Sequence, residues 1–583
     1  MLQPFRATSI VLVKSSLPLS RARPLWLSSA RLEVLLFGVL ALLMLGIGIG
    51  LRDPWPSDEP RFALVARAMV EHGQWLFPHR GSELYADKPP LFMWLQAGGY
   101  LLTHNWRVAF MLPSLLAGLG ALALVYDLAR RLWNHRSALL AATTLLVTIH
   151  FTYQMRNAQI DPLLLGWMTL ANYGLLRHLL LGPAWRWFAL GCFAAGLGVI
   201  TKGVGVLALL MLVPYALARH RRWRMLADIH GRWRWWIGAC AFLLPVLAWL
   251  LPMVLVARAD GDPQHAAYVQ DILFGQTVHR YATPTGHLHS PLYFLTIIAV
   301  DWLPLSLLLP WAIPAWWRRL RRADARFALP LGWFLLVLIF FSISPGKRDV
   351  YILPTLPMVV LALTPLLPGL LRKRSVRMTV FALTGLLSVA MTVAAALALV
   401  RHPPWATRIE QALDPHMWWL LLGIGVAGLL IAALTRIRHA AVGWLLLSSV
   451  LWSVYALGAY PLLNGDRSAR DVMTRARVIA GVKAPIGLLA WKEQNLLMAT
   501  GPVTEFGFLQ PWPRQYEDAT TWLRAEPGPR WVFSRDEAMG ACVVRQRAHF
   551  VGHANRRNWW MFQLDAVIPG CVPRTTTDTA DAD

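Results

Sequence analysis

The sequence predicts an α-helical membrane protein with many spans and a small α/β domain at its C-terminal end. Of the 583 residues, 56% are hydrophobic and only 15% are charged, and the mean hydropathy is +0.45. A soluble domain has roughly a quarter of its residues charged. Apolar runs long enough to cross a bilayer as helices recur through residues 1–463, and beyond residue 464 charged residues return and the apolar runs shorten.

Thirteen apolar segments are candidates for transmembrane helices, because a helix of about 20 residues crosses the hydrocarbon core. The first lacks a cleavage site and is too long for the core of a signal peptide, so we expect it to be retained. No internal repeat of the kind common in transporters is visible. The segments lie near residues 33–51, 106–128, 137–155, 161–180, 187–201, 203–218, 235–256, 291–315, 327–344, 350–368, 378–400, 417–435 and 440–463.

The distribution of positive charge predicts the orientation of these spans. The formal net charge of +25 comes from short Lys and Arg clusters beside the spans. This pattern is typical of juxtamembrane anchors and not of a stripe that follows phosphates, which excludes a nucleic-acid partner. With a cytoplasmic N-terminus and thirteen spans, every basic cluster falls inside. The loops 52–105 and 257–290, the turn 344–349 and the C-terminal tail then fall outside.

Residues 464–583 are predicted to form one soluble α/β domain, since about 120 residues suffice for a small core. Segments 486–491, 531–536 and 558–564 are predicted strands, and 470–481 and 516–528 are predicted helices that end at glycine. Cys542 and Cys571 both lie in this tail. An oxidising compartment permits a disulfide between them, but the sequence alone does not decide it.

The loop 52–105 has more acidic, basic and aromatic groups than a simple connection requires. Asp58 and Glu59 precede Pro60, and apolar residues then recur at helical spacing as far as Gly73. This pattern predicts an amphipathic helix on the membrane surface with two acids at its N-terminus. One acid could simply cap the helix, but two acids favour a catalytic role for Asp58 and Glu59.

Further polar residues occur where other spans reach the outer face. Asp161 begins the fourth span, either as a helix cap or as part of a pocket with Asp58. Lys202 lies in the turn between two short spans, where it either reaches to the interface or binds a lipid phosphate. Lys347 and Tyr351 belong to the turn and helix start at 344–354, and basic residues there oppose the positive-inside trend.

The loop 275–294 adds Arg280 and closely spaced histidines, among them His287. Histidines suggest a metal site, but the loop has no cysteine and no HExxH spacing, so this signal is weak.

These motifs together resemble the superfamily of bacterial aminoarabinose transferases and protein O-mannosyltransferases, which are membrane glycosyltransferases of the GT-C fold. The family pattern runs in order over roughly residues 33–365. One residue departs from it: the aminoarabinose transferases usually have glutamate before the lysine of KPP, and here Asp87 is a shorter acid. The matching residues are Asp58-Glu59, Phe62, Gly73-Gln74-Trp75, Pro78, Leu84-Tyr85, Lys88-Pro89-Pro90, Asp161, Thr201-Lys202-Gly203, Arg280-Tyr281, His287, Pro291, Lys347 and Tyr351-Ile352-Leu353-Pro354.

The resemblance implies transfer of a sugar from a polyprenyl phosphate to an acceptor on the periplasmic side of a bacterial inner membrane. The sugar is expected to be 4-amino-4-deoxy-L-arabinose or a relative, and the acceptor lipid A or lipopolysaccharide. The alternatives are another glycan or a protein as acceptor, or a transporter, which would need charges near mid-span. The expected roles are catalysis for Asp58, Asp161 and Glu59, donor phosphate binding for Lys88, Lys202, Arg280, Lys347 and Tyr351, substrate binding for Arg61 and Tyr85, and a divalent metal at Asp87 and His287.

Overall fold

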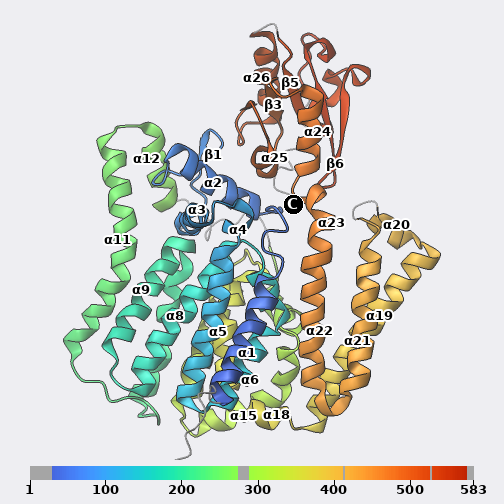
Figure 1. Ribbon diagram of the computed structural model, residues 1–583. Coiled ribbons are helices and arrows are strands. Elements are labelled where there is room, and N and C mark those ends of the chain that lie inside the picture. Colours follow the sequence, from blue (N-terminus) through green and yellow to red (C-terminus); the bar gives the residue numbers. More distant parts are fainter. Residues whose placement is uncertain (1–28, 274–287, 411–413, 526–527, 574–583) are drawn as a thin grey trace, which may run out of the picture.

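The computed structural model describes residues 29–273, 288–410, 414–525 and 528–573. Figure 1 shows a bundle of long helices with a smaller α/β unit above one end. The bundle contains α1 (Ser29–Gly46), α5 (Leu112–Leu132), α6 (His135–Leu146), α7 (Ile149–Met155), α8 (Ile160–Leu181), α9 (Trp185–Lys202), η1 (Val204–Met211), α10 (Leu212–His220), α11 (Trp236–Ala259), α14 (Tyr293–Val300), α15 (Leu309–Arg321), α16 (Ala325–Ile343), η5 (Asp349–Thr355), α17 (Leu356–Leu363), α18 (Leu367–Leu370), α19 (Arg374–Arg401), α21 (Met417–Thr435) and α22 (Ala440–Val454).

The predicted spans are helical, but thirteen is not the number that length and composition support. Seven helices of the described residues are long and apolar enough to cross a membrane, or nine if each of two bent pairs is one span. The bent pairs are α6 with α7, at 68°, and α14 with residues 305–321, at 95°. The remaining four predicted spans are α8, α9 and two shorter apolar segments, Val204–His220 and Asp349–Leu363.

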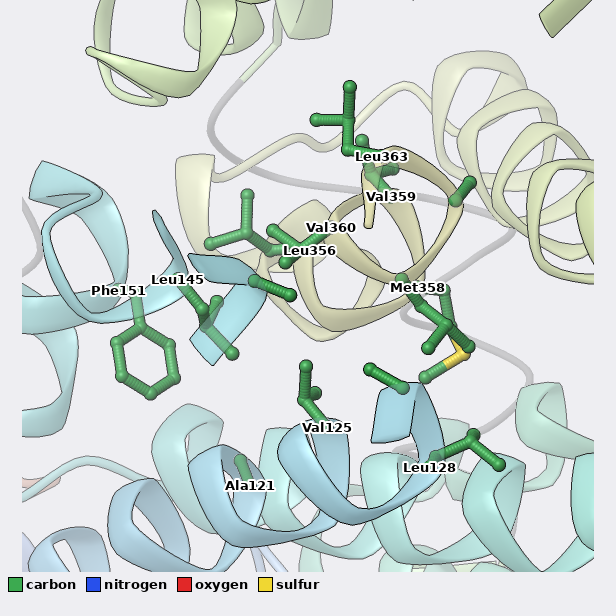
Figure 2. Close-up of a cluster of buried hydrophobic side chains, with 14 of the residues drawn as sticks. Ala121, Val125, Leu128, Leu145, Phe151, Leu356, Met358, Val359, Val360 and Leu363 are labelled. Atoms are coloured by element: carbon green, nitrogen blue, oxygen red, sulfur yellow. The ribbon is translucent and has the colours of Figure 1, made fainter. Parts of the chain in front are cut away.

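The bundle core is a continuous cluster of apolar side chains from distant segments. Figure 2 shows one part of it, where Val125 and Leu128 of α5 face Met358 and Leu356 of α17. All four are at most 1% exposed. Because close van der Waals packing holds helices together inside a membrane, α17 is fixed against α5, and η5, which precedes α17, is fixed with it.

Between the bundle and the α/β unit lies a layer formed by residues 52–105 and the start of the next span. Figure 1 shows α2 and α3 across the end of the bundle, beneath the α/β elements. Pro60 near the start of α2 and the left-handed Gly73 (φ 71°) at its C-cap bound the amphipathic helix that the sequence predicted. The elements are α2 (Glu59–His72), β1 (His79–Arg80), β2 (Glu83–Leu84), α3 (Leu91–Thr103) and α4 (Trp106–Ala109).

The C-terminal residues form a five-stranded sheet in the order β4-β3-β5-β7-β6. β3 is parallel to β4 and β5, and β7 is antiparallel to β5 and β6. The three predicted strands are present as β3, β5 and β7, and the two predicted helices as α24 and α26. The elements are α23 (Tyr460–Arg467), α24 (Arg470–Ala480), β3 (Ile486–Leu489), α25 (Glu493–Met498), β4 (Val503–Glu505), α26 (Trp512–Ala525), β5 (Trp531–Arg535), α27 (Asp536–Met539), β6 (His549–Ala554) and β7 (Arg557–Phe562).

Cys542 and Cys571 form a disulfide with a Cα–Cα distance of 5.4 Å. This answers the question that the sequence left open. The disulfide closes a segment with a sequence separation of 29 residues that contains β6 and β7.

Ion pairs to one buried carboxylate attach the α/β unit to the layer below. Asp53, 2% exposed, accepts hydrogen bonds from Arg470 Nε and Nη2, each at 2.6 Å, and from Arg107 Nε at 2.8 Å. Asn464 Nδ2 donates to it at 2.8 Å. Although burial alone would raise it, the hydrogen bonds from Arg470, Arg107 and Asn464 lower the pKa of Asp53 to about 2.

Two of the basic turns and three of the segments assigned to the outer face lie at opposite ends of α16. Arg224 N donates to Ala323 O at 2.9 Å, so two of the basic turns meet each other. At the other end, Lys347 Nζ donates to His289 O at 3.0 Å, and Arg348 Nη2 donates to Asp58 at 3.1 Å. Three segments assigned to the outer face therefore gather at one place.

Candidate functional site

The first part of the candidate site is built by the antiparallel pair α8 and α9. The two helices pack closely because Gly174 faces Gly191: a Cβ on Gly174 would lie 2.8 Å from Gly191 Cα. Asp161 is in the first turn of α8 and Lys202 is the last residue of α9, so the pair brings them to the same end. Lys202 Nζ donates to Asp161 Oδ1 at 2.5 Å. It also lies 4.8 Å from the ring centroid of Tyr351 in η5.

The second part is Asp58, which precedes α2 and lies between two guanidinium groups. Arg348 Nη2 is 3.1 Å from Asp58 Oδ2, and Arg61 Nη1 is 3.9 Å from Asp58 Oδ1. The Asp58 side chain is 17% exposed and makes no side-chain cap to α2. Asp58 therefore occupies the N-cap position of α2, but its carboxylate does not cap the helix as the simpler interpretation of the sequence proposed.

Arg348 joins the two parts electrostatically. Burial lowers the pKa of the Arg348 guanidinium, but the nearby carboxylates of Asp58 and Asp161 outweigh this effect and raise it above its ordinary value. Asp58 reaches the start of η5 through Arg348, and Asp161 reaches η5 through Lys202 and Tyr351. The predicted meeting of Asp58, Asp161 and Lys88 in one outward cavity stays a prediction. Two acids and two cations beside η5 can hold an anionic group beside an oxygen nucleophile.

Glu59 differs from its neighbour in every contact. It is 4% exposed and pairs with the buried Arg52, whose Nη2 donates to Glu59 Oε1 at 2.8 Å. Its oxygens also accept from the backbone N–H groups of Trp55, at 2.8 Å, and Ala158, at 2.7 Å. With both oxygens occupied inside the protein, the geometry favours a structural role for Glu59 and not the catalytic role that the sequence predicted.

Lys347 is also placed differently from the sequence prediction. Its ammonium donates to three backbone carbonyls, those of Ser344 at 2.5 Å, His289 at 3.0 Å and Pro345 at 3.5 Å, and the residue is 2% exposed. These contacts join the turn at 344–348 to the segment that contains His289. The neighbouring Arg348, not Lys347, faces Asp58.

The rest of loop 52–105 contacts the α/β unit. Arg61 Nε donates to Glu493 Oε1 of α25 at 2.9 Å, and Arg80 Nη1 lies 3.6 Å from the same oxygen. Tyr85 is 1% exposed, and burial raises the pKa of its phenol. Lys88 Nζ donates to the carbonyl of Asp87 at 3.0 Å. The predicted substrate contacts of Arg61 and Tyr85, and the phosphate contact of Lys88, stay predictions.

Only one of the two predicted metal ligands, Asp87, lies in the part of the chain that the structure describes. Asp87, whose side chain is 48% exposed, lies 3.9 Å from Arg80 Nη1. His287 and the predicted phosphate ligand Arg280 lie outside the described residues. Among residues 29–273, 288–410, 414–525 and 528–573, no group of three or more His, Cys, Asp or Glu side chains could hold a metal ion.

Two residues of the site were not among the predicted site residues. Arg348 directly precedes η5 and has extended backbone, and the sequence pointed to it only as the second base of the outward pair Lys347-Arg348. The sequence has no signal that separates the roles of these two bases. Glu493 is separated from Arg61 by 432 residues, and the sequence has no signal for this contact.

Comparison with known proteins places these residues in a family context. The family model described as dolichyl-phosphate-mannose-protein mannosyltransferase matches residues 87–249. The undecaprenyl phosphate-alpha-4-amino-4-deoxy-L-arabinose arabinosyl transferase of Pseudomonas aeruginosa (strain LESB58) is 31% identical over 440 residues, which cover 72% of this chain and 74% of that protein. The protein of the same name from Pectobacterium carotovorum is 32% identical over 350 residues, and the match spans only 58% of each chain.

The fold is shared with a solved structure, that of ArnT from Cupriavidus metallidurans bound to undecaprenyl phosphate. The TM-score is 0.72 at 20% identity, and the match covers 92% of this chain and 99% of that chain. The similarity therefore extends over both the helical bundle and the α/β unit.

Proposed function

The chain belongs to the family of undecaprenyl phosphate-α-4-amino-4-deoxy-L-arabinose arabinosyl transferases, and we propose that it transfers this sugar, or a related one, from a polyprenyl phosphate to lipid A or lipopolysaccharide. The observation that carries the proposal is the meeting of Asp58, Arg348, Asp161 and Lys202 at one end of the bundle. These four groups come from four separate segments, and each has a task in glycosyl transfer.

The reaction breaks the bond between the anomeric carbon of the sugar and a phosphate oxygen, and it forms a bond from that carbon to an acceptor oxygen. Negative charge develops on the departing polyprenyl phosphate. Lys202 and Arg348 are placed to stabilise this charge, because fixed cations in a site with little water act strongly on a developing anion. Asp161 orients the Lys202 ammonium through their 2.5 Å contact.

Asp58 is proposed to act on the acceptor. If the acceptor is a hydroxyl group, Asp58 takes its proton as a general base. If the acceptor is already a phosphate, no proton has to be removed, and Asp58 positions the acceptor together with Arg348.

We propose that the protein lies in a bacterial inner membrane with its N-terminus in the cytoplasm and the α/β unit in the periplasm. The basic turns at one end and the acid-rich loops at the other support this orientation. The disulfide between Cys542 and Cys571 supports an oxidising compartment for the α/β unit.

The proposal includes a divalent metal at Asp87 and His287, as the family resemblance implied. The half-exposed Asp87 carboxylate suits a hard cation, but Arg80 beside it does not favour one. The described residues do not complete a site around Asp87. No step above therefore depends on a metal.

The experiment is mass spectrometry of lipid A and of polyprenyl-linked sugars from cells with and without this chain. We expect an added aminoarabinose on lipid A with the wild-type chain. Asp58→Asn keeps the shape of the side chain and should lower transfer about 10²–10⁴-fold with normal membrane insertion. The control Asp518→Asn, in an exposed pair on α26, should leave transfer unchanged. If the sugar is instead found on another glycan or on a protein, lipid A is not the acceptor. If Asp58→Asn keeps full transfer, Asp58 is not the general base.

A further inference from the structure

We propose that Glu493 of the α/β unit is a positioning residue for sugar transfer: it holds Arg61 and thereby fixes the Arg61 guanidinium beside Asp58. This inference rests on the proposed function, because it gives the α/β unit a part in the reaction at Asp58. The residue that acts on the substrate is Asp58, and Glu493 acts on it only through Arg61.

The first observation is the burial and pairing of Glu493. Its side chain is 4% exposed, and its Oε1 lies 2.9 Å from Arg61 Nε and 3.6 Å from Arg80 Nη1. A buried carboxylate is costly unless cations compensate it, and here both cations belong to the loop below and not to the α/β unit itself. Arg80 is in turn held against Phe508 of the α/β unit, with 3.9 Å between its Cζ and the ring centroid.

The second observation is the position of Arg61 between two carboxylates. Its Nε donates to Glu493, and its Nη1 points to Asp58 Oδ1 at 3.9 Å. Because the guanidinium is planar and rigid, a hydrogen bond that fixes Nε also fixes where Nη1 lies. Arg61 therefore balances part of the charge of Asp58 without forming a direct hydrogen bond to Oδ1.

The third observation is that the other oxygen of Asp58 is already used. Arg348 Nη2 donates to Asp58 Oδ2 at 3.1 Å, so Oδ1 is the oxygen left for an acceptor. A direct charged hydrogen bond from Arg61 would need about 2.8 Å and would occupy Oδ1. Glu493 keeps Arg61 about an ångström further away. Without the charge of Glu493, Arg61 keeps its ion pair with the Asp58 carboxylate, which can then draw it closer.

Docking of the α/β unit alone would not require this arrangement. The same interface has another guanidinium contact, in which Arg67 Nη1 of α2 donates to Leu497 O of α25 at 3.1 Å. Arg67 lies two turns further along α2 and pairs with Glu71, at 2.7 Å, not with Asp58. Arg67→Gln thus loosens the same interface without touching the Asp58 network, and it is the matched control.

The experiment measures steady-state transfer by the purified full chain in detergent with its polyprenyl-phosphate sugar donor, for Glu493→Gln, Arg67→Gln, Arg61→Gln and the double variant Glu493→Gln/Arg61→Gln. We expect Glu493→Gln to lower kcat about tenfold, as for the loss of one charged hydrogen bond, with the KM for the donor within about twofold. Arg67→Gln should keep kcat within about twofold. In the Arg61→Gln background, Glu493→Gln should have almost no further effect, because its action passes through Arg61.

Equal losses of kcat in Glu493→Gln and Arg67→Gln would overturn the inference, and so would a full effect of Glu493→Gln in the Arg61→Gln background. If Glu493→Gln is not recovered as folded protein, Glu493→Asp is measured in its place. Its shorter carboxylate should lower kcat at unchanged donor KM, and a wild-type kcat would refute the role. Failure of the proposed function looks different, since the wild-type chain itself would then transfer no sugar.

Discussion

Glu59→Gln should destabilise the protein much more than it affects the chemistry of any molecule that still folds. The reason is the neighbour of Glu59: Arg52 is 1% exposed, and Glu59 is the acid with which it forms an ion pair. Arg52 is further enclosed by aromatic rings, with its Cζ 4.8 Å from the centroid of Trp55 and 5.1 Å from that of Tyr460. A glutamine would place a neutral amide there and leave the arginine charge without its anionic partner.

The expected loss of stability follows from the burial of both partners, Glu59 and Arg52. Removal of one partner of a buried ion pair costs about 3–5 kcal/mol, because the other charge stays in the protein without compensation. The amide oxygen can still accept from Trp55 N or Ala158 N, so we place the cost toward the lower end of that range. The matched control is Glu71→Gln at the other end of α2, whose exposed pair with Arg67 should contribute less than about 1 kcal/mol.

The assay is thermal unfolding of the purified variants in one detergent, together with specific activity per folded molecule. Glu59→Gln should melt well below the wild type and Glu71→Gln close to it, and Asp58→Asn should melt normally while its transfer is lost. A Glu59→Gln protein that melts like the wild type and has lost transfer would refute the structural role and restore Glu59 as a catalytic acid.

Three further predictions follow from the site and its surroundings. Lys202→Ala should weaken binding of a polyprenyl-phosphate donor about ten- to a hundred-fold, the effect of one charged contact to phosphate, and unchanged donor binding by the purified variant would make Lys202 an interfacial anchor. The pKa of Asp53 is lowered from 3.8 to about 2, so between these pH values the unfolded state binds more protons than the folded state. The contribution of Asp53 to the free energy of unfolding should therefore fall by about 2 kcal/mol as pH falls from about 4 to 2. Asp53→Asn should remove this part of the acid sensitivity, measured as melting temperature against pH. If a metal is bound at Asp87 and His287, EDTA should abolish transfer and an added divalent ion should restore it. Asp87→Asn should need a higher concentration of the ion for the same recovery. Full activity in EDTA would show that transfer needs no metal.

Those parts of the site that depend on local sequence order could be predicted. Asp161 and Lys202 lie at the facing ends of two consecutive antiparallel helices, so their proximity follows from the order of the spans. The helix after Asp58 follows from Pro60, the apolar spacing and Gly73. The number of spans was less accessible, because short and bent helices such as those at 135–155 and 349–363 have apolar composition without the length of a simple span.

What the sequence could not supply is the direction in which neighbouring side chains point. Asp58 and Glu59 are adjacent acids, yet one lies between two guanidinium groups beside the site and the other accepts four hydrogen bonds inside the protein. Lys347 and Arg348 are adjacent bases, yet the first binds backbone carbonyls and the second binds Asp58.

In both pairs the residue turned away from the site is the one that fixes the backbone of the residue turned toward it. Glu59 ties the start of α2 to Arg52 and to Ala158 N, just before α8, and Lys347 ties the turn at 344–348 to His289. Both backbones are thereby held where Asp58 and Arg348 meet at 3.1 Å. A motif in which two charged residues stand together therefore describes one group that acts and one that anchors it, and only the contacts of the folded chain tell the two apart.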